Sequence, residues 1–292
     1  MSEPKTVGLI GAGLMGQVFA RRLIDAGFSV RGFDVAPAKR AQLTEMGGES
    51  VDSIAQIATT CQPIILAVFS TDQVEEVVEE MLPVLGDGSG KIVLCTSTCD
   101  PDRIASLGGR VAERGLRFLE TPVSGTSEQV RRGEGVGLIG GDKAVAAAVA
   151  PVLDVLFPNR FHIGKVGDGG RAKLAINLIV GINRLALAEG LVFAERMGLD
   201  PAAFFDVAKR SAAYSQVMDT KGPKMLRGDF APEGRARQTL KDAHLMLEQA
   251  KSKGQRLPLL EIHADVLEGC VRNGHGDLDN SVIIEEMRRR RI

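Results

Sequence analysis

The sequence predicts an α/β domain built on a doubly wound parallel sheet, followed by an all-α domain. In the first half, short apolar runs alternate with amphipathic helical patterns, which is typical of parallel strands joined by helices. In the second half the strand-like runs stop, and helical patterns follow one another directly. The glycine-rich stretch "GKVGDGG" at 164–170 separates the halves, so we place the domains at residues 1–165 and 166–292.

The predicted strands are apolar runs of a few residues, each bounded by turn residues or by a helical pattern. The first helix, within "LMGQVFARRLIDAG", places Phe19 and Leu23 on one face and ends at Gly27. The strands are expected at Thr6–Ile10, Ser29–Phe33, Pro63–Phe69, Lys91–Cys95, Leu116–Leu119, Val136–Ile139 and Arg160–Ile163.

Helices of the second half are separated by glycine and proline, which break helical patterns. The first of them is long and almost wholly apolar, and we expect it to connect the two domains. The helices are predicted at 170–197, 201–211, 214–226, 237–253, 258–272 and 280–290.

The composition excludes several classes of protein. The chain has 292 residues, 44% hydrophobic and 25% charged, which is typical of a globular protein of two domains. A net charge of −1 gives no overall field that favours nucleic acid or a membrane surface. No apolar run reaches roughly 18 residues without a charge or a glycine, so we expect no membrane span. The N-terminal "MSEPKTVGLIGAG" lacks the features of a signal peptide, so we expect a cytoplasmic protein.

The cysteines and histidines do not have the spacing of a metal site. There are four of each, no CxxC pair occurs, and the histidines are scattered. We therefore expect no metal and free, buried thiols. Cys95 and Cys99 flank a loop after a predicted strand, so one of them is a candidate for a position near a ligand.

A glycine-rich loop joins the first strand to the first helix. Its residues Gly11, Gly13, Leu14, Met15 and Gly16 form a GxGxxG motif in the context that a dinucleotide-binding Rossmann fold requires. The first glycine permits the turn, the second admits a pyrophosphate, and the third lets helix and strand pack closely. The helix N-terminus then attracts the phosphates.

Asp34 follows the second predicted strand, at the distance from the glycines where an acid binds the adenosine ribose hydroxyls. Its charge would repel a 2′-phosphate, so NAD is favoured and NADP is less favoured. Three cationic residues lie nearby in the sequence, so NADP remains an alternative: Arg31, Lys39 and Arg40.

Four motifs in this order resemble the β-hydroxyacid dehydrogenase family, which includes 3-hydroxyisobutyrate, tartronate semialdehyde and threonate enzymes. They are "GLIGAGLMG", "ETPVSGTSEQVRRG", "GDGGRAKLAIN" and "TLKDAHL". The resemblance covers almost the whole chain. It implies an oxidoreductase that transfers a hydride between NAD and a small hydroxy acid such as 3-hydroxyisobutyrate.

The resemblance implies that Lys173 is the catalytic general acid/base and Asn177 its partner. The chemistry of the residues agrees with these roles, because side chains four residues apart share one helix face. An ammonium and an amide there can meet one substrate oxygen. Reduction of a carbonyl needs a proton donor at that oxygen, and oxidation of the alcohol needs a base.

Other residues are assigned by the same resemblance. Ser124 and Gly125 would bind the substrate carboxylate through the hydroxyl and the surrounding backbone amides. Val68, at the end of a predicted strand, and Ser97, after the next predicted strand, would contact the cofactor. Lys241 would reach the cofactor from the helical domain, with a plain ion pair to Asp242 or Glu248 as the alternative.

The chain departs from the family where we expect the lip of the substrate site. Thr126, Val130 and Glu134 replace smaller or differently shaped family residues. Val68-Phe69 stands for the usual Leu-Pro, and Cys95 for an aspartate. These differences make the reaction type a safer prediction than the substrate.

Alternatives to a 3-hydroxyisobutyrate-like substrate are tartronate semialdehyde, which would be reduced, or an aldonate such as threonate. An imine reductase is disfavoured because that group lacks a lysine at the position of Lys173. A further alternative is a non-catalytic NAD-binding regulator, against which Lys173 and Asn177 also argue. We expect a homodimer or homotetramer assembled through the helical domain, with neither nucleic acid nor membrane as a partner.

Overall fold

The computed structural model describes residues 6–85 and 88–290. Residues 1–5 lie outside these ranges. They begin the N-terminal segment for which the sequence predicts no signal peptide. By its contacts the chain divides into two compact units, Met1–Lys173 (unit 1) and Leu174–Ile292 (unit 2). The division falls inside helix α9 (Asp168–Arg196), which begins in unit 1 and continues through unit 2.

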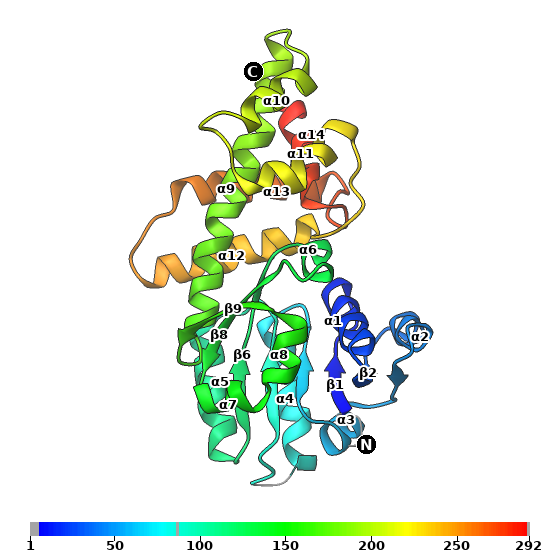
Figure 1. Cartoon of the computed structure of the whole chain (residues 1–292). Helices are drawn as coiled ribbons and strands as arrows, with labels where there is room; N and C mark the ends of the chain where they lie inside the picture. Colours follow the sequence, from blue (N-terminus) through cyan, green and yellow to red (C-terminus); the bar gives the residue numbers. More distant parts are fainter. Residues whose placement is uncertain (1–5, 86–87, 291–292) are drawn as a thin grey trace. The chain divides into compact units, whose positions relative to one another are not determined.

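Nine strands among the described residues form one sheet in unit 1 (Figure 1). The strand order is β3-β2-β1-β4-β5-β6-β8-β7, and β9 pairs with β8. Pairing is parallel from β3 to β6. The strands are β1 (Thr6–Ile10), β2 (Ser29–Phe33), β3 (Glu49–Ser50), β4 (Ile64–Leu66), β5 (Ile92–Cys95), β6 (Arg117–Glu120), β7 (Val123–Ser124), β8 (Val136–Gly141) and β9 (Asn159–Gly164).

The predicted doubly wound parallel sheet is confirmed from β3 to β6, but the expectation that β8 extends it in parallel is wrong, because β8 runs antiparallel to both β6 and β7. A parallel neighbour needs a long crossover, usually an α-helix that covers the sheet. Between β6 and β8 the chain forms only β7 and the five-residue helix α6 (Ser127–Arg131). The chain therefore turns back, and β7 folds against β8.

Two helical layers cover the sheet because the side chains of each strand alternate between its faces. In β4, Ile64 and Leu66 pack against α3, α4 and α5, whereas Ile65 faces α1, α2 and α8. All three side chains are fully buried. The helices are α1 (Leu14–Asp25), α2 (Pro37–Glu45), α3 (Ile54–Thr60), α4 (Thr71–Leu85), α5 (Pro101–Glu113), α7 (Lys143–Ala148) and α8 (Ala150–Leu156).

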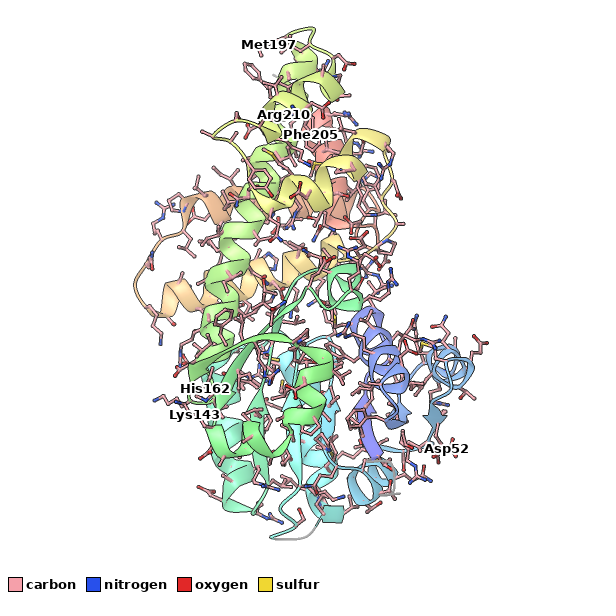
Figure 2. The ribbon with its side chains drawn as sticks, viewed as in Figure 1. Asp52, Lys143, His162, Met197, Phe205 and Arg210 are labelled. Atoms are coloured by element: carbon pink, nitrogen blue, oxygen red, sulfur yellow. The ribbon has the colours of Figure 1, made fainter. Side chains whose placement is uncertain are left out.

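Unit 2 is helical and has its own apolar core. The Phe205 ring of α10, labelled in Figure 2, packs so closely on α11 that a Cβ at Gly222 would lie 2.2 Å from it. Leu191, Leu260 and Leu267 are fully buried in this core. The elements are α9, α10 (Pro201–Lys209), α11 (Gln216–Arg227), α12 (Ala236–Ser252), α13 (Pro258–Arg272), the 3₁₀ turn η1 (Asn280–Val282) and α14 (Ile283–Arg289).

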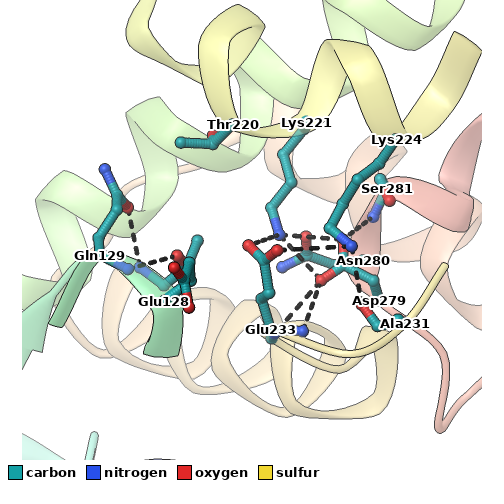
Figure 3. Close-up of polar contacts among 12 residues, drawn as sticks. Glu128, Gln129, Thr220, Lys221, Lys224, Ala231, Glu233, Asp279, Asn280 and Ser281 are labelled. Atoms are coloured by element: carbon teal, nitrogen blue, oxygen red, sulfur yellow. Dashed lines mark hydrogen bonds and ion pairs between the residues drawn. The ribbon is translucent and has the colours of Figure 1, made fainter. Parts of the chain in front are cut away.

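A buried ion pair joins α11 to the turn η1 (Figure 3). Lys221 Nζ donates to both carboxylate oxygens of Asp279 at 2.9 Å, and the exposed fractions of these residues are 3% and 0%. Asp279 also accepts the N–H of Ser281 at 3.0 Å and that of Glu233 at 2.9 Å. With all of these partners present, the buried charge of Asp279 is compensated.

By length and composition, α9 is the one helix in the described part of the chain that could cross a membrane. The same criterion is met by core helices of water-soluble proteins. Its apolar stretch contains Gly181 and Arg184, and 39% of that stretch is buried within the protein. Leu185, Leu187 and Leu191 are among its residues that pack in the core of unit 2.

Candidate active site

The glycine-rich loop has the geometry that a dinucleotide requires. Gly11 has a φ of 94°, and a Cβ there would lie 2.5 Å from the carbonyl oxygen of Ala67. A Cβ at Gly16 would lie 2.0 Å from the carbonyl oxygen of Gly11, so both positions require glycine. At Gly13, the N-cap of α1, a Cβ would meet no described atom within 4 Å.

The space above Gly13 and the first amides of α1 suit a pyrophosphate, because no side chain caps this helix. Leu14 and Met15 form its first turn and are half-buried. This is the physical fit of the loop to a dinucleotide. Backbone N–H groups of the loop and of α1 would hold the phosphates, so the side chains of these residues matter little for this contact.

Asp34 lies beside this loop. Its Oδ2 accepts the N–H of Ala12 at 2.7 Å and its Oδ1 accepts the N–H of Ala36 at 2.9 Å. Each carboxylate oxygen keeps acceptor capacity for a ribose hydroxyl. Arg40 donates to the carbonyl oxygen of Asp34 at 2.7 Å, so a cation lies next to this aspartate.

Val68 and Ser97 come together at the carboxyl ends of β4 and β5. The Ser97 hydroxyl donates to the carbonyl oxygen of Val68 at 2.7 Å. A Cβ at Gly11 would lie 3.2 Å from Val68 Cγ1, so Val68 also borders the glycine-rich loop. The sheet order changes direction at β1 and β4, and ligands of such sheets bind at this switch point. Three of the predicted cofactor positions therefore lie side by side.

Cys95 and Cys99 are both buried. Both are free thiols, with exposed fractions of 1% and 3%. The contact with Cys99 and burial raise the pKa of Cys95 well above its usual value, so its thiol stays protonated. The prediction of free, buried thiols is confirmed for all four cysteines.

Ser124 ends the short strand β7, and Gly125 follows with a φ of 141°, a conformation that favours glycine. Thr126 then caps α6: its hydroxyl accepts the N–H of Gln129 at 3.2 Å. The N–H of Thr126 donates to Gln129 Oε1 at 2.9 Å. This amide is therefore engaged, and a carboxylate held here would depend on Ser124 and the remaining amides.

The residues expected at the lip of the substrate site have structural roles in unit 1. Thr126 forms the capping box just described. Val130 is fully buried in the core, so the prediction that its side chain lines the lip is wrong. Glu134 is exposed and pairs with Arg132 at 2.7 Å. Capping, packing and surface pairing are thus the contacts that the structure shows for these three residues.

Lys173 lies in the second turn of α9, with an exposed fraction of 7%. The first turn of this helix is held by Glu120, the last residue of β6. The Glu120 carboxylate accepts the backbone N–H groups of Gly167 at 2.5 Å, Gly169 at 2.9 Å and Gly170 at 3.2 Å. Sequence reasoning missed Glu120, although an acid at the end of a buried strand, two residues before Pro122, was a visible signal.

Asn177 and Lys241 share one carboxylate in unit 2. Asn177 Nδ2 donates to Asp242 Oδ2 at 3.2 Å, and Lys241 Nζ lies 2.9 Å from Asp242 Oδ1. Asp242 is buried, with an exposed fraction of 7%. The structure thus contains the ion pair that was the alternative for Lys241. Sequence reasoning missed Asp242 as the group that orients Asn177, because the two are far apart in the chain.

Two family models cover most of the chain. The NAD-binding domain of 6-phosphogluconate dehydrogenase matches residues 6–164. The model described as NAD-binding of NADP-dependent 3-hydroxyisobutyrate dehydrogenase matches residues 167–287.

Similar proteins match over nearly their whole length. The 2-hydroxy-3-oxopropionate reductase of Escherichia coli K12 is 30% identical, over 96% of this chain and 96% of that protein. The L-threonate dehydrogenase of Cupriavidus necator is 29% identical, over 96% and 95%. A solved 3-hydroxyisobutyrate dehydrogenase from Salmonella typhimurium has a TM-score of 0.86 and 26% identity, over 96% of this chain and 99% of that chain.

Proposed function

Because the chain belongs to the β-hydroxyacid dehydrogenase family, whose members are NAD(P)-dependent oxidoreductases, we propose that it oxidises a small hydroxy acid with NAD. The observation that carries the proposal is the buried Lys173 in a helix whose first turn is fixed by three hydrogen bonds. A lysine held this way suits proton transfer, because its ammonium form can give a proton to a bound substrate and its neutral amine can take one.

In the proposed reaction, Ser124 and Gly125 bind the substrate carboxylate. Lys173 Nζ takes the proton of the substrate hydroxyl during oxidation and returns it to the carbonyl oxygen during reduction. Asn177, oriented by Asp242, holds the same substrate oxygen. The bound nicotinamide would accept or supply the hydride.

The substrate we favour is 3-hydroxyisobutyrate or a close analogue. Tartronate semialdehyde, which is 2-hydroxy-3-oxopropionate, and L-threonate are the alternatives, and enzymes named for these two substrates are among the similar proteins. All three are small acids, so one carboxylate site at Ser124 serves each of them.

The preferred cofactor in this proposal is NAD. Support comes from Asp34, whose carboxylate lies beside the glycine-rich loop and would repel a 2′-phosphate. Arg40 is the counter-argument, because a guanidinium at this place attracts such a phosphate.

We also propose a cytoplasmic homodimer or homotetramer assembled through unit 2. Large apolar side chains are exposed on several of its helices, and a second copy of the chain would cover them. They include Ile179 and Phe193 of α9, Val207 of α10, and Leu259 and Ile262 of α13, all with exposed fractions of 55% to 67%.

The test is a kinetic screen of the purified protein with NAD and with NADP. The hydroxy acids are 3-hydroxyisobutyrate, threonate, glycerate and 3-hydroxypropionate, and tartronate semialdehyde is tested for reduction. We expect clear turnover of at least one of these compounds. Binding of NAD with no turnover of any of them would instead favour the non-catalytic regulator.

A further inference from the structure

We propose that Glu120 is a positioning residue of the dehydrogenase site, which fixes Lys173 relative to the segment that carries Ser124. The inference rests on the proposed function. Glu120 touches no substrate atom in this scheme; it acts through the backbone of α9.

The carboxylate of Glu120 is enclosed by glycines. Its exposed fraction is 3%, and it accepts three N–H groups from the stretch Gly167–Gly170. A Cβ at Gly140 would lie 2.2 Å from Glu120 Oε1, and one at Gly169 would lie 3.3 Å from Glu120 Cδ. Backbone from β8 and from α9 therefore approaches the carboxylate closely, and this leaves it little freedom to move.

We call the Glu120 carboxylate and its three backbone hydrogen bonds the Glu120 clamp. Two short covalent paths lead from it to the proposed catalytic groups. Along one, β6 ends at Glu120 and the chain reaches Ser124 through the rigid Pro122. Along the other, Gly170 leads to Lys173 within a single helical turn. All of these residues belong to unit 1. Disturbing the clamp would thus shift the proton-transfer group relative to the substrate-binding segment.

A carboxylate suits this position better than an amide does. Three N–H donors at a helix N-terminus need acceptors and favour negative charge. Glutamine would keep the shape of the side chain, but its NH₂ group would face one of the backbone donors. Glu120→Gln therefore weakens the clamp without removing bulk.

The charge of Glu120 changes near neutral pH. Burial raises its pKa to about 7, although the three backbone hydrogen bonds act in the opposite direction. The neighbouring charged or titratable groups are Asp168 from α9 and Cys95 from β5, and Lys173 follows on α9. The facing residue of β8, Gly140, adds none. Below pH 7 the clamp loses its charge.

The experiment compares the wild type with Glu120→Gln and with the shorter Glu120→Asp. The control is Asp142→Asn, which alters the exposed cap of α7, where Asp142 accepts the N–H of Ala144 at 2.6 Å. For each protein, kcat for carbonyl reduction is measured from pH 6 to 9, together with the cofactor Kd. The reduction direction is chosen because it needs Lys173 protonated, so Lys173 causes loss only on the alkaline side.

We expect Glu120→Gln to lower kcat roughly 10- to 100-fold with a cofactor Kd within twofold of wild type, as for a small misplacement of a reacting group. The wild type should lose activity below about pH 7, and this acid limb should be absent in Glu120→Gln. Asp142→Asn should change neither quantity. An unchanged kcat in Glu120→Gln, or an acid limb that persists in it, would overturn the inference.

A second measurement needs no turnover. Hydrogen exchange of the Gly167, Gly169 and Gly170 amides is followed in the wild type between pH 5 and 9, after correction for the intrinsic rates. Acylation of Lys173 is compared between the wild type and the Glu120 variants by mass spectrometry. We expect protection to fall as Glu120 is protonated, and Lys173 to react severalfold faster in the variants. No change in either would overturn the inference. A wild type that turns over no hydroxy acid refutes the proposed function, and these two readouts then still show separately whether Glu120 fixes Lys173.

Discussion

Asp34 has one observed role and one proposed role. It accepts two backbone N–H groups and so stabilises the loop that would receive the pyrophosphate. In the proposed complex it would also set a negative charge where NAD has a hydroxyl and NADP a phosphate. A substitution that keeps one acceptor oxygen separates these two effects.

We predict that Asp34→Asn or Asp34→Ser raises the ratio of kcat/KM with NADP to that with NAD by roughly tenfold or more, because charge repulsion is removed. Adding Arg40→Gln to either variant should reverse part of the gain, since a cation next to Asp34 is lost. The measurement is steady-state kinetics with both cofactors. A wild type that already prefers NADP would show that the role given to Asp34 is wrong.

Lys173→Ala should lower kcat by roughly 10²- to 10⁴-fold, which is the usual contribution of a general acid/base. The NAD dissociation constant should stay the same, because Lys173 lies outside the glycine-rich loop. Lys173→Arg should not restore activity, since a guanidinium stays protonated. Calorimetric NAD binding is measured beside kcat. A near-normal kcat in Lys173→Ala would leave Lys173 as an ordinary helix residue.

At the scale of elements, α9 and α13 approach each other at Gly181, where a Cβ would lie 2.6 Å from the His263 ring. His263 has an exposed fraction of 1%, and neither ring nitrogen has a hydrogen-bond partner among the described residues. Burial and, secondarily, the charge of Arg184 lower the pKa of His263 to about 3. The packing of these helices therefore requires a neutral imidazole.

The unfolded chain takes up a proton at His263 once the pH falls below the usual value of 6.5, whereas the folded chain does not until about pH 3. Stability is therefore lost progressively as the pH falls between these values. Between pH 7 and pH 5 we expect the unfolding free energy of the wild type to fall by about 2 kcal/mol because of His263. In His263→Phe this contribution should be absent. Denaturant titrations at both pH values measure it, and the same change at exposed His244 is the control. Equal pH dependence in His263→Phe and wild type would contradict the prediction.

Periodicity predicted the elements that are long or have a clear pattern. The expected strands at Thr6–Ile10 and Ser29–Phe33 are observed with the same bounds, as is the helix at 258–272. The strands β3 and β7 were missed because two residues are too few to show alternation. Each pairs with a strand from another part of the chain, β3 with β2 and β7 with β8. The sequence of the short segment itself does not show such a partner.

The same reasoning explains which site residues were found. Backbone requirements are visible in sequence, so the glycine-rich loop was located with its glycines in the correct places. Glu120 and Asp242 act through partners about 50 and 65 residues away, at Gly167–Gly170 and Asn177. Val130 was misassigned because its contact with the core depends on how α6 packs. Tertiary contacts of this kind have no local pattern.

At the scale of the whole molecule, the exposed apolar side chains of unit 2 lead to a prediction about assembly. The wild type should elute with a light-scattering mass that is a multiple of the single chain. Ile179→Glu combined with Phe193→Glu should shift the mass toward the monomer, because charges would replace apolar contacts. The control is Val35→Glu in unit 1, where Val35 is 85% exposed. A monomeric wild type would refute the prediction.

The course of α9 through the boundary of the two units limits how the gene can change in length. Each residue inserted into an α-helix turns everything beyond it by about 100° and advances it by 1.5 Å. An insertion between Lys173 and Asn177 would thus place the ammonium and the amide on different sides of the helix. Insertions in the exposed connection at 253–256, between α12 and α13, carry no such penalty, since a surface loop absorbs them. Length differences among the descendants of this chain should therefore accumulate in its loops, while the number of residues between the Glu120 clamp and Asn177 stays constant.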